Sequence, residues 1–234
     1  MAFYRLSILV LTIAIGGAVC PAQILSGAQR DSQTFTLSGV VVNSVTNQPI
    51  RRALVEMYAR QPRAVLTDSE GHFSFDGLNF GSYSLTARKP GYFSETEVSR
   101  GRRGNFQVMV GPDTGSLTVK LLPEAVVTGS ILDGDGLPVP RLRVQLLRRE
   151  IVEGRGRWQP MQIKPSDENG NYRISGLLPG TYVIAAGPQS MPVALFGRPN
   201  GRAVGFRQIF FPNSDNMEGA AKLSLLPGQR VEAN

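Results

Sequence analysis

Hydrophobic and polar positions alternate along most of this chain in short runs. Residues 53–57 and 83–87 place an apolar or small side chain at every second position. A period of two is typical of a β-strand with one buried face. No segment after the first 22 residues keeps a helical apolar period over three turns, and single Gly and Pro residues separate the runs. The pattern predicts an all-β fold of short strands joined by turns.

The first 22 residues are the exception, because they carry an uninterrupted apolar run. Arg5 precedes about 14 apolar or small residues from Leu6 to Val19, and Ala22 closes a stretch suited to cleavage. Such a run is short for a membrane span and typical of a secretory signal peptide. Two alternatives stay open. One is a lipoprotein acylated at Cys20, for which Val19 is a poor preceding residue, and the other is an uncleaved anchor. Cleavage after Ala22 would leave a mature chain without cysteine.

The remainder of the chain contains two copies of one pattern. Five positions recur 99 residues apart: Asp68, Gly71, Phe73, Gly81 and Tyr83 correspond to Asp167, Gly170, Tyr172, Gly180 and Tyr182. Upstream, Pro49 and Val55 recur 89 residues later as Pro138 and Val144. The difference of 10 residues predicts an insertion between Leu146 and Asp167, in an extended hairpin around residues 154–157. Repetition in register predicts two homologous structural units.

We therefore expect two tandem Greek-key β-sandwich units of about seven strands each. The predicted boundaries are a signal peptide at 1–22, a linker at 23–34, unit 1 at 35–123 and unit 2 at 124–234. Residues 105–122 alternate as the closing strands of unit 1 would, and residues 222–226 resemble 107–110. The counterpart of residues 116–122 is not found, so unit 2 is expected to lack its last strand.

These motifs resemble the carboxypeptidase regulatory-like domain, a transthyretin-like (prealbumin-like) sandwich grouped with carbohydrate-binding-like folds. Unit 1 carries the pattern Gly, Pro-Ile, Ala-x-Val-x-Met, Thr-Asp-x-x-Gly-x-Phe and Leu-x-x-Gly-x-Tyr, and it departs at Phe80, where Pro is usual. Unit 2 carries the same order with Ser166 in place of Thr. The resemblance implies a non-catalytic domain, and the matching residues are those of turns and core rather than of a site.

Composition and charge argue against nucleic-acid binding, catalysis and metal binding. The net charge is +7, but no zinc finger, recognition helix or RNA-binding motif supports a nucleic-acid partner. His72 is the only histidine, so a catalytic triad or a zinc site is not expected. Asp133-Gly134-Asp135-Gly136 is better explained by a tight turn than by calcium, since the spacing of an EF-hand is absent. We expect no catalytic residue, no metal and no cofactor.

The candidate binding residues are Trp158, Arg155 and Arg157, in the inserted hairpin. An exposed aromatic ring can stack on a sugar, although the same tryptophan could instead pack on the sandwich. The sequence thus predicts a secreted or periplasmic structural or interaction module with weak carbohydrate binding and no membrane span after signal cleavage. Its expected partner is an extracellular polysaccharide or another protein module. The alternative is an accessory N-terminal region of a larger secreted carboxypeptidase or TonB-dependent-like receptor.

Overall fold

The computed structural model describes residues 33–59, 61–100, 104–187 and 208–234. These residues are nearly all β, as the alternation predicts. The predicted signal peptide, its cleavage point and Cys20 lie outside the described residues. Within the described part of the chain, no helix is long and apolar enough to cross a membrane.

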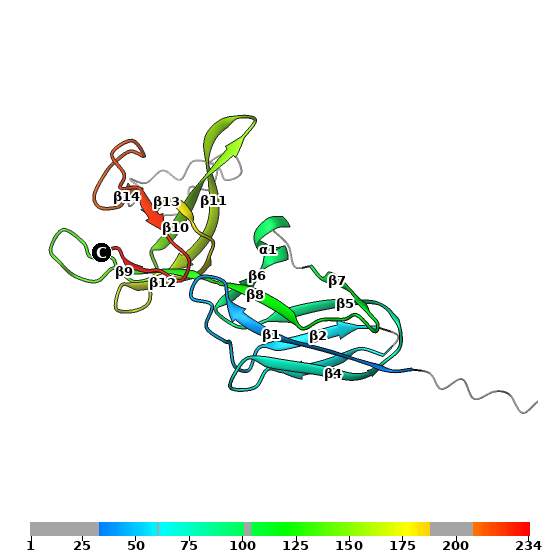
Figure 1. Cartoon of the computed structure of the whole chain (residues 1–234). Helices are drawn as coiled ribbons and strands as arrows, with labels where there is room; N and C mark the ends of the chain where they lie inside the picture. The colour runs from blue at the N-terminus through cyan, green and yellow to red at the C-terminus, as the bar shows by residue number, and fades with distance from the viewer. Residues whose placement is uncertain (1–32, 60, 101–103, 188–207) are drawn as a thin grey trace, which may run out of the picture. The chain divides into compact units, whose positions relative to one another are not determined.

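Unit 1 is a sandwich of two four-stranded sheets (Figure 1). One sheet has the order β4-β1-β8-β6 and the other the order β3-β2-β5-β7. The strands are β1 (Phe35–Asn43), β2 (Leu54–Tyr58), β3 (Arg63–Leu66), β4 (His72–Leu78), β5 (Gly81–Arg88), β6 (Tyr92–Ser94), β7 (Phe106–Val110) and β8 (Leu117–Pro123). The helix α1 (Glu95–Arg100) follows β6, and Ser94 and Glu97 bond each other's backbone N–H groups in a capping box.

Unit 2 repeats this arrangement. One sheet has the order β12-β9-β16; in the other, β11, β10 and β13 are joined by β14 and β15, which both pair with β13. The strands are β9 (Ala125–Ser130), β10 (Arg143–Val152), β11 (Arg155–Pro165), β12 (Asn171–Leu177), β13 (Gly180–Gly187), β14 (Ile209–Phe210), β15 (Leu223–Leu225) and β16 (Arg230–Glu232). The inserted residues lengthen the β10–β11 hairpin, as the sequence predicts.

Each unit has its own core, built from the inward positions of the alternating strands. Val55 and its counterpart Val144 are both fully buried, which confirms the predicted phase of β2 and β10. Tyr83 is half-buried and Tyr182 is buried, and each phenol donates a hydrogen bond to the carbonyl four residues earlier, at Asn79 and at Leu178. Burial is the main cause of the raised pKa of Tyr182.

The closing strand of unit 2 departs from the sequence expectation. In unit 1, β8 runs parallel to β1 and pairs with it from Gly39 to Asn43. In unit 2, β16 runs parallel to β9 and pairs with Val126 to Thr128. Arg230–Glu232 contains a single apolar residue, so this short strand has no alternating pattern from which it could be predicted. Unit 2 thus has the beginning of the strand that the sequence pattern indicated to be missing.

Candidate functional site

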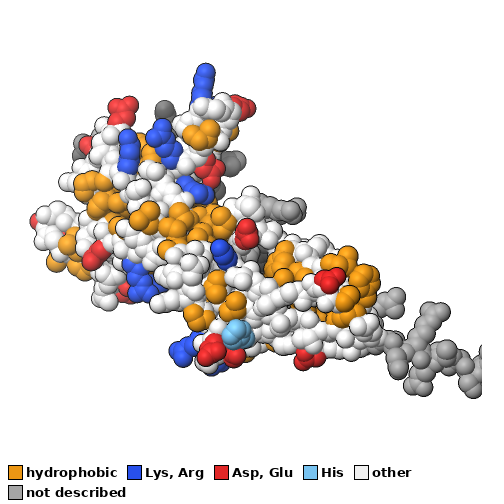
Figure 2. Space-filling view, viewed as in Figure 1, with side chains coloured by type: hydrophobic (Ala, Val, Ile, Leu, Met, Phe, Trp, Pro, Cys, Tyr) orange, Lys and Arg blue, Asp and Glu red, His pale blue; other side chains and the backbone are white. Residues whose placement is uncertain are grey.

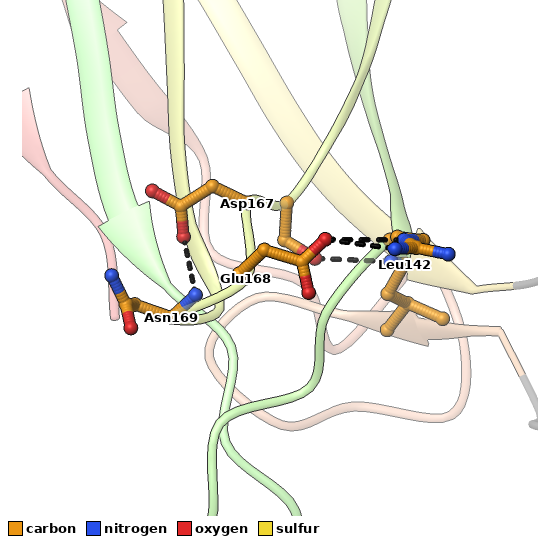
Figure 3. A network of polar contacts seen from close by, with 6 residues as sticks. Leu142, Asp167, Glu168 and Asn169 are labelled. Carbon is orange, nitrogen blue, oxygen red and sulfur yellow. Dashed lines mark hydrogen bonds and ion pairs between the residues drawn. The ribbon is translucent and has the colours of Figure 1, made fainter.

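The aspartates of the repeated motif are bound to their own turns. Asp68 Oδ1 accepts hydrogen bonds from the backbone N–H groups of Glu70 and His72, at 2.9 and 2.8 Å. Asp167 Oδ1 accepts the same two bonds in unit 2, from Asn169 and Asn171, at 2.9 and 2.8 Å. Figure 3 shows the bond from Asn169 beside the contact of Glu168 with the neighbouring loop. These carboxylates serve as Asx-turn acceptors.

The glycine that ends each turn is required by close backbone approach. Gly71 and Gly170 have φ angles of +77° and +75°. A Cβ on Gly71 would lie 2.7 Å from the carbonyl oxygen of Val41, and one on Gly170 would lie 2.6 Å from that of Ile131. The position therefore accepts no larger residue without strain.

A buried hydroxyl precedes each aspartate and ties two loops together. Thr67 Oγ1 accepts from the N–H of Ala53 at 2.8 Å and donates to the carbonyl of Ile50 at 2.6 Å. Ser166 Oγ accepts from the N–H of Leu142 at 3.0 Å and donates to the carbonyl of Val139 at 2.7 Å. Ser166 in unit 2 thus makes the same two hydrogen bonds as Thr67 in unit 1.

The other polar residues that the sequence analysis considered are Asp133 and His72. Asp133 Oδ1 accepts from the N–H groups of Asp135 and Leu137 at 3.0 and 2.9 Å, which is the predicted tight turn. His72 is exposed on the surface of unit 1 (pale blue in Figure 2) and lies 3.7 Å from Glu70. Among the described residues, no group of three or more His, Cys, Asp or Glu side chains is placed to hold a metal ion.

The structure places Trp158, Arg155 and Arg157 on one strand but not on one surface. On β11, Trp158 is opposite Arg149, Arg157 is opposite Glu150, and Arg155 is opposite Val152. Successive side chains of a strand face opposite sides of a sheet, so the tryptophan and the two arginines point away from each other. The sequence predicts all three in the inserted hairpin, but it does not give the strand register that determines which face each side chain occupies.

The half-buried Trp158 ring packs on a small cluster on the outer face of the sheet. The cluster consists of Leu147, Val183, Ala185, Phe210 and Ala220. Arg155 and Arg157 are exposed, and Arg157 lies 3.8 Å from Glu153. The tryptophan therefore contributes to packing of the outer face, and any ligand would meet only the exposed part of its ring.

The described residues of unit 2 also line a cavity of about 550 Å³ that sequence reasoning missed. Its apolar walls come from both sheets and from the segment after β14: Ile131, Val139, Leu142, Val144, Tyr172, Ile184, Ala186, Ile209 and Phe211. Asp133, Gly134, Ala233 and Asn234 also line it. No single motif marks this cavity, because its walls are core residues.

The buried side chain of Tyr172 is part of the cavity wall. Tyr172 donates a hydrogen bond to the carbonyl oxygen of Ala233 at 2.6 Å. Burial raises the pKa of Tyr172 to about 12. The phenol is therefore neutral at physiological pH and fixes the end of the chain against β12.

Comparison with known families finds a match over unit 1. Residues 36–121 match the model of the carboxypeptidase regulatory-like domain. The match confirms the resemblance on the residues that carry it, and the repeated bonding of Asp68/Asp167 and Thr67/Ser166 extends the same turn chemistry to unit 2.

Comparison with individual proteins finds more distant similarity. The chain is 24% identical over 143 residues to Colossin-A of Dictyostelium discoideum, in an alignment that covers 58% of this chain and 1% of that protein. The chain thus spans about 1% of the length of that curated relative.

Among solved structures, the chain is similar to a streptococcal ancillary pilin, with 16% identity, 87% of this chain and 63% of that chain covered, and a TM-score of 0.39. The Bacillus anthracis TIE protein is 16% identical, with 85% of this chain and 33% of that chain covered and a TM-score of 0.36. The minor pilin GBS52 of Streptococcus agalactiae is 16% identical, with 85% of this chain and 93% of that chain covered and a TM-score of 0.35.

Proposed function

We propose that this protein is a non-catalytic extracellular module that serves a structural and interaction role. The observation that carries the proposal is the hydrogen bonding of the side chains in the repeated motif. Oδ1 of Asp68 and of Asp167 and the hydroxyl oxygens of Thr67 and Ser166 are hydrogen-bonded to backbone groups of their own unit. Side chains committed in this way stabilise a scaffold and leave its strand edges and loops for interaction.

The extracellular assignment is supported by the N-terminal pattern and by the family match of unit 1. We expect residues 1–22 to direct export and to be removed after Ala22. Expression of the full chain in a bacterial host, followed by fractionation and N-terminal sequencing, tests this. A periplasmic or secreted product that starts at Gln23 is expected, and a matched chain without residues 2–22 should stay in the cytoplasm. A lipid-modified Cys20 would establish the anchored alternative instead.

The finer proposal is weak carbohydrate binding at the β10–β11 hairpin. It is supported by the partly exposed ring of Trp158 and by two exposed arginines on the same strand. A polysaccharide array with the wild-type protein tests binding. Trp158→Phe keeps an aromatic ring for the outer cluster, whereas Arg155→Ser with Arg157→Ser alters only the other face of the strand. Loss of binding in one variant alone would identify the face, and no binding by the wild type would leave a purely structural role.

The alternative assignment treats the chain as the accessory region of a larger secreted carboxypeptidase or TonB-dependent-like receptor. Its support is the family match alone, because domains of this kind accompany such proteins. The reading frame downstream of the codon for Asn234 would test it directly.

A further inference from the structure

The β10–β11 hairpin extends beyond the rest of its sheet (Figure 1). β10 pairs with β13 only from Arg143 to Arg148, whereas it pairs with β11 from Arg143 to Val152. The end of the hairpin, residues 149–158, is therefore a two-stranded ribbon. Its side chains lie outside the sandwich core of unit 2, so they are available for a role other than packing that core.

One face of this ribbon combines a cation with the tryptophan. Arg149 is opposite Trp158, and Ile151 is opposite Gly156, in the register of the two strands. Residues opposite each other in antiparallel strands lie on the same face, with Cβ atoms about 4.5–5.5 Å apart. We call the face that carries Arg149, Ile151, Gly156 and Trp158 the outer ribbon face. Arg155 and Arg157 lie on the opposite face of the ribbon.

The guanidinium of Arg149 lies over the backbone of Gly156. A Cβ at Gly156 would be 2.8 Å from Nε and 3.3 Å from Cζ of Arg149. Because glycine has no side chain, it leaves the space that the guanidinium occupies. Ile151 on the opposite strand is 74% exposed, so apolar surface continues along the outer ribbon face beyond the guanidinium.

The charge of Arg149 is not neutralised within the described part of the chain. The side chain is exposed, and no described carboxylate lies within ion-pair distance of it. The two acidic residues of the hairpin have other partners: Glu150 lies 3.8 Å from Arg148, and Glu153 lies 3.8 Å from Arg157. The N–H donors of a guanidinium match the two oxygens of a carboxylate. The outer ribbon face can therefore accept a carboxylate beside a partly exposed aromatic ring.

We propose that the outer ribbon face binds an acidic polysaccharide through a uronate residue. The sugar ring stacks on the exposed part of Trp158, and the carboxylate accepts two hydrogen bonds from Arg149. The cross-strand spacing of about 5 Å is comparable with the width of one sugar ring, so one uronate reaches both groups. Ile151 contacts the next sugar of the chain. This inference rests on the proposed carbohydrate binding at the hairpin, and it names the face and the chemical class of the ligand.

The overall charge of the protein is a separate source of attraction for acidic polymers. A net charge of +7 attracts any polyanion, but it distinguishes neither the two faces of the ribbon nor a sugar from another acidic chain. Selectivity for a uronate requires the aromatic ring and the guanidinium together. An experiment must therefore separate the carboxylate, the sugar ring and the net charge.

The test uses the full chain and oligomers of polygalacturonate, alginate and hyaluronan, each compared with its carboxyl-reduced form. Trp158 is the only tryptophan, so its fluorescence reports contact with its ring. At least one uronate oligomer should change the emission saturably, and its carboxyl-reduced form should bind at least about fivefold more weakly. Poly-L-glutamate, which has carboxylates without sugar rings, should cause no saturable change. No binding by any uronate, or equal binding by its reduced form or by poly-L-glutamate, would overturn the proposal.

Three variants test the position of the guanidinium, with far-UV circular dichroism to confirm that each keeps the fold. Arg149→Gln should weaken uronate binding about tenfold, because it removes the charged hydrogen bonds. Gly156→Ala keeps the charge but displaces the flexible side chain of Arg149, and should weaken binding about threefold. The control Arg173→Gln removes the same charge from the exposed face of β12 and should bind within about twofold of the wild type. Undiminished binding in Arg149→Gln or Gly156→Ala, or an equal loss in Arg173→Gln, would overturn the proposal.

Failure of this inference is distinguishable from failure of the proposed function. Equal binding of neutral and acidic oligomers would support carbohydrate binding at the hairpin and reject the uronate site. Saturable binding in calorimetry without a change in the emission of Trp158 would place the sugar elsewhere on the protein and also reject it. Export and removal of residues 1–22 are measured independently of both.

Discussion

Removal of the buried hydroxyl of Ser166 should destabilise unit 2 by a measurable and specific amount. Ser166 is 3% exposed, and its Oγ joins the N–H of Leu142 to the carbonyl of Val139. Ser166→Ala deletes both bonds and leaves two backbone groups unpaired. A hydrogen bond contributes about 1 kcal/mol net, and an unpaired buried group costs about 1–3 kcal/mol. We expect a total loss of roughly 2–4 kcal/mol, a large part of the stability of a small domain.

Urea denaturation followed by tryptophan fluorescence measures this loss. Trp158 is the only tryptophan and packs within unit 2, so its emission reports on that unit. With a slope of about 2 kcal/mol per molar urea, the middle of the usual range, the midpoint should fall by about 1–2 M. Ser224→Ala on the exposed face of β15 is the matched control and should change stability by less than about 0.5 kcal/mol.

The repeat provides a second control in unit 1. Thr67→Val removes the equivalent hydroxyl and keeps the shape of the side chain, so far-UV circular dichroism should show a comparable loss in unit 1. If Ser166→Ala shifts the midpoint no more than Ser224→Ala does, then the buried hydroxyl does not connect the two loops, and the repeated turn chemistry is not what stabilises the units.

Further substitutions test the core, the turns and the end of the chain. Val55→Ala and Val144→Ala should each cost on the order of 1–3 kcal/mol, because both side chains are fully buried; an unchanged denaturation midpoint would reject the inward phase. Gly71→Ala should destabilise the protein by more than about 1 kcal/mol, because φ is +77° and the new Cβ meets the carbonyl of Val41. The control Gly115→Ala, with open space around it, should be near neutral. Equal losses of stability would show that Gly71 is not required by its turn. The pKa of Tyr172 is about 12 in the folded state and about 10 in the unfolded chain. The protonated phenol therefore stabilises the fold by roughly 1–3 kcal/mol below pH 10, and this stabilisation is lost between pH 10 and pH 12. Tyr172→Phe should remove that part of the pH dependence and cost about 0.5–1.5 kcal/mol at neutral pH; the same alkaline loss in both proteins would show that another group is responsible.

The fold could be predicted because its signals are local and repeated. Alternation around Val55 and Val144 reports strand phase directly, since period two follows from backbone geometry. The turn residues Asp68 and Gly71 recur at a fixed spacing because each has a backbone task that few residues perform. Because the pattern is duplicated, the strand phase and turns that are clear in the sequence of unit 1 could also be predicted for unit 2.

The candidate sites were harder to predict because they depend on pairing between distant segments. Trp158 lies on a strand rather than in a loop, and only the register with Arg149 shows that it faces away from Arg155 and Arg157. The strand β16 could not be predicted, because parallel pairing with β9 joins residues about 100 positions apart and needs no alternating sequence. The cavity in unit 2 is lined by core residues that are far apart in the sequence, and no local pattern indicates the space between them.

Residue-resolved amide hydrogen exchange tests the central claim most directly. The claim is that the two units share one hydrogen-bonded framework. The N–H groups of Val41 and Ile131, which donate to the carbonyls of Gly71 and Gly170, should be protected in both units. The N–H groups of Ala53 and Leu142, which donate to the hydroxyl oxygens of Thr67 and Ser166, should be protected as well. Rapid exchange at Ile131 and Leu142 beside slow exchange at Val41 and Ala53 would contradict the account.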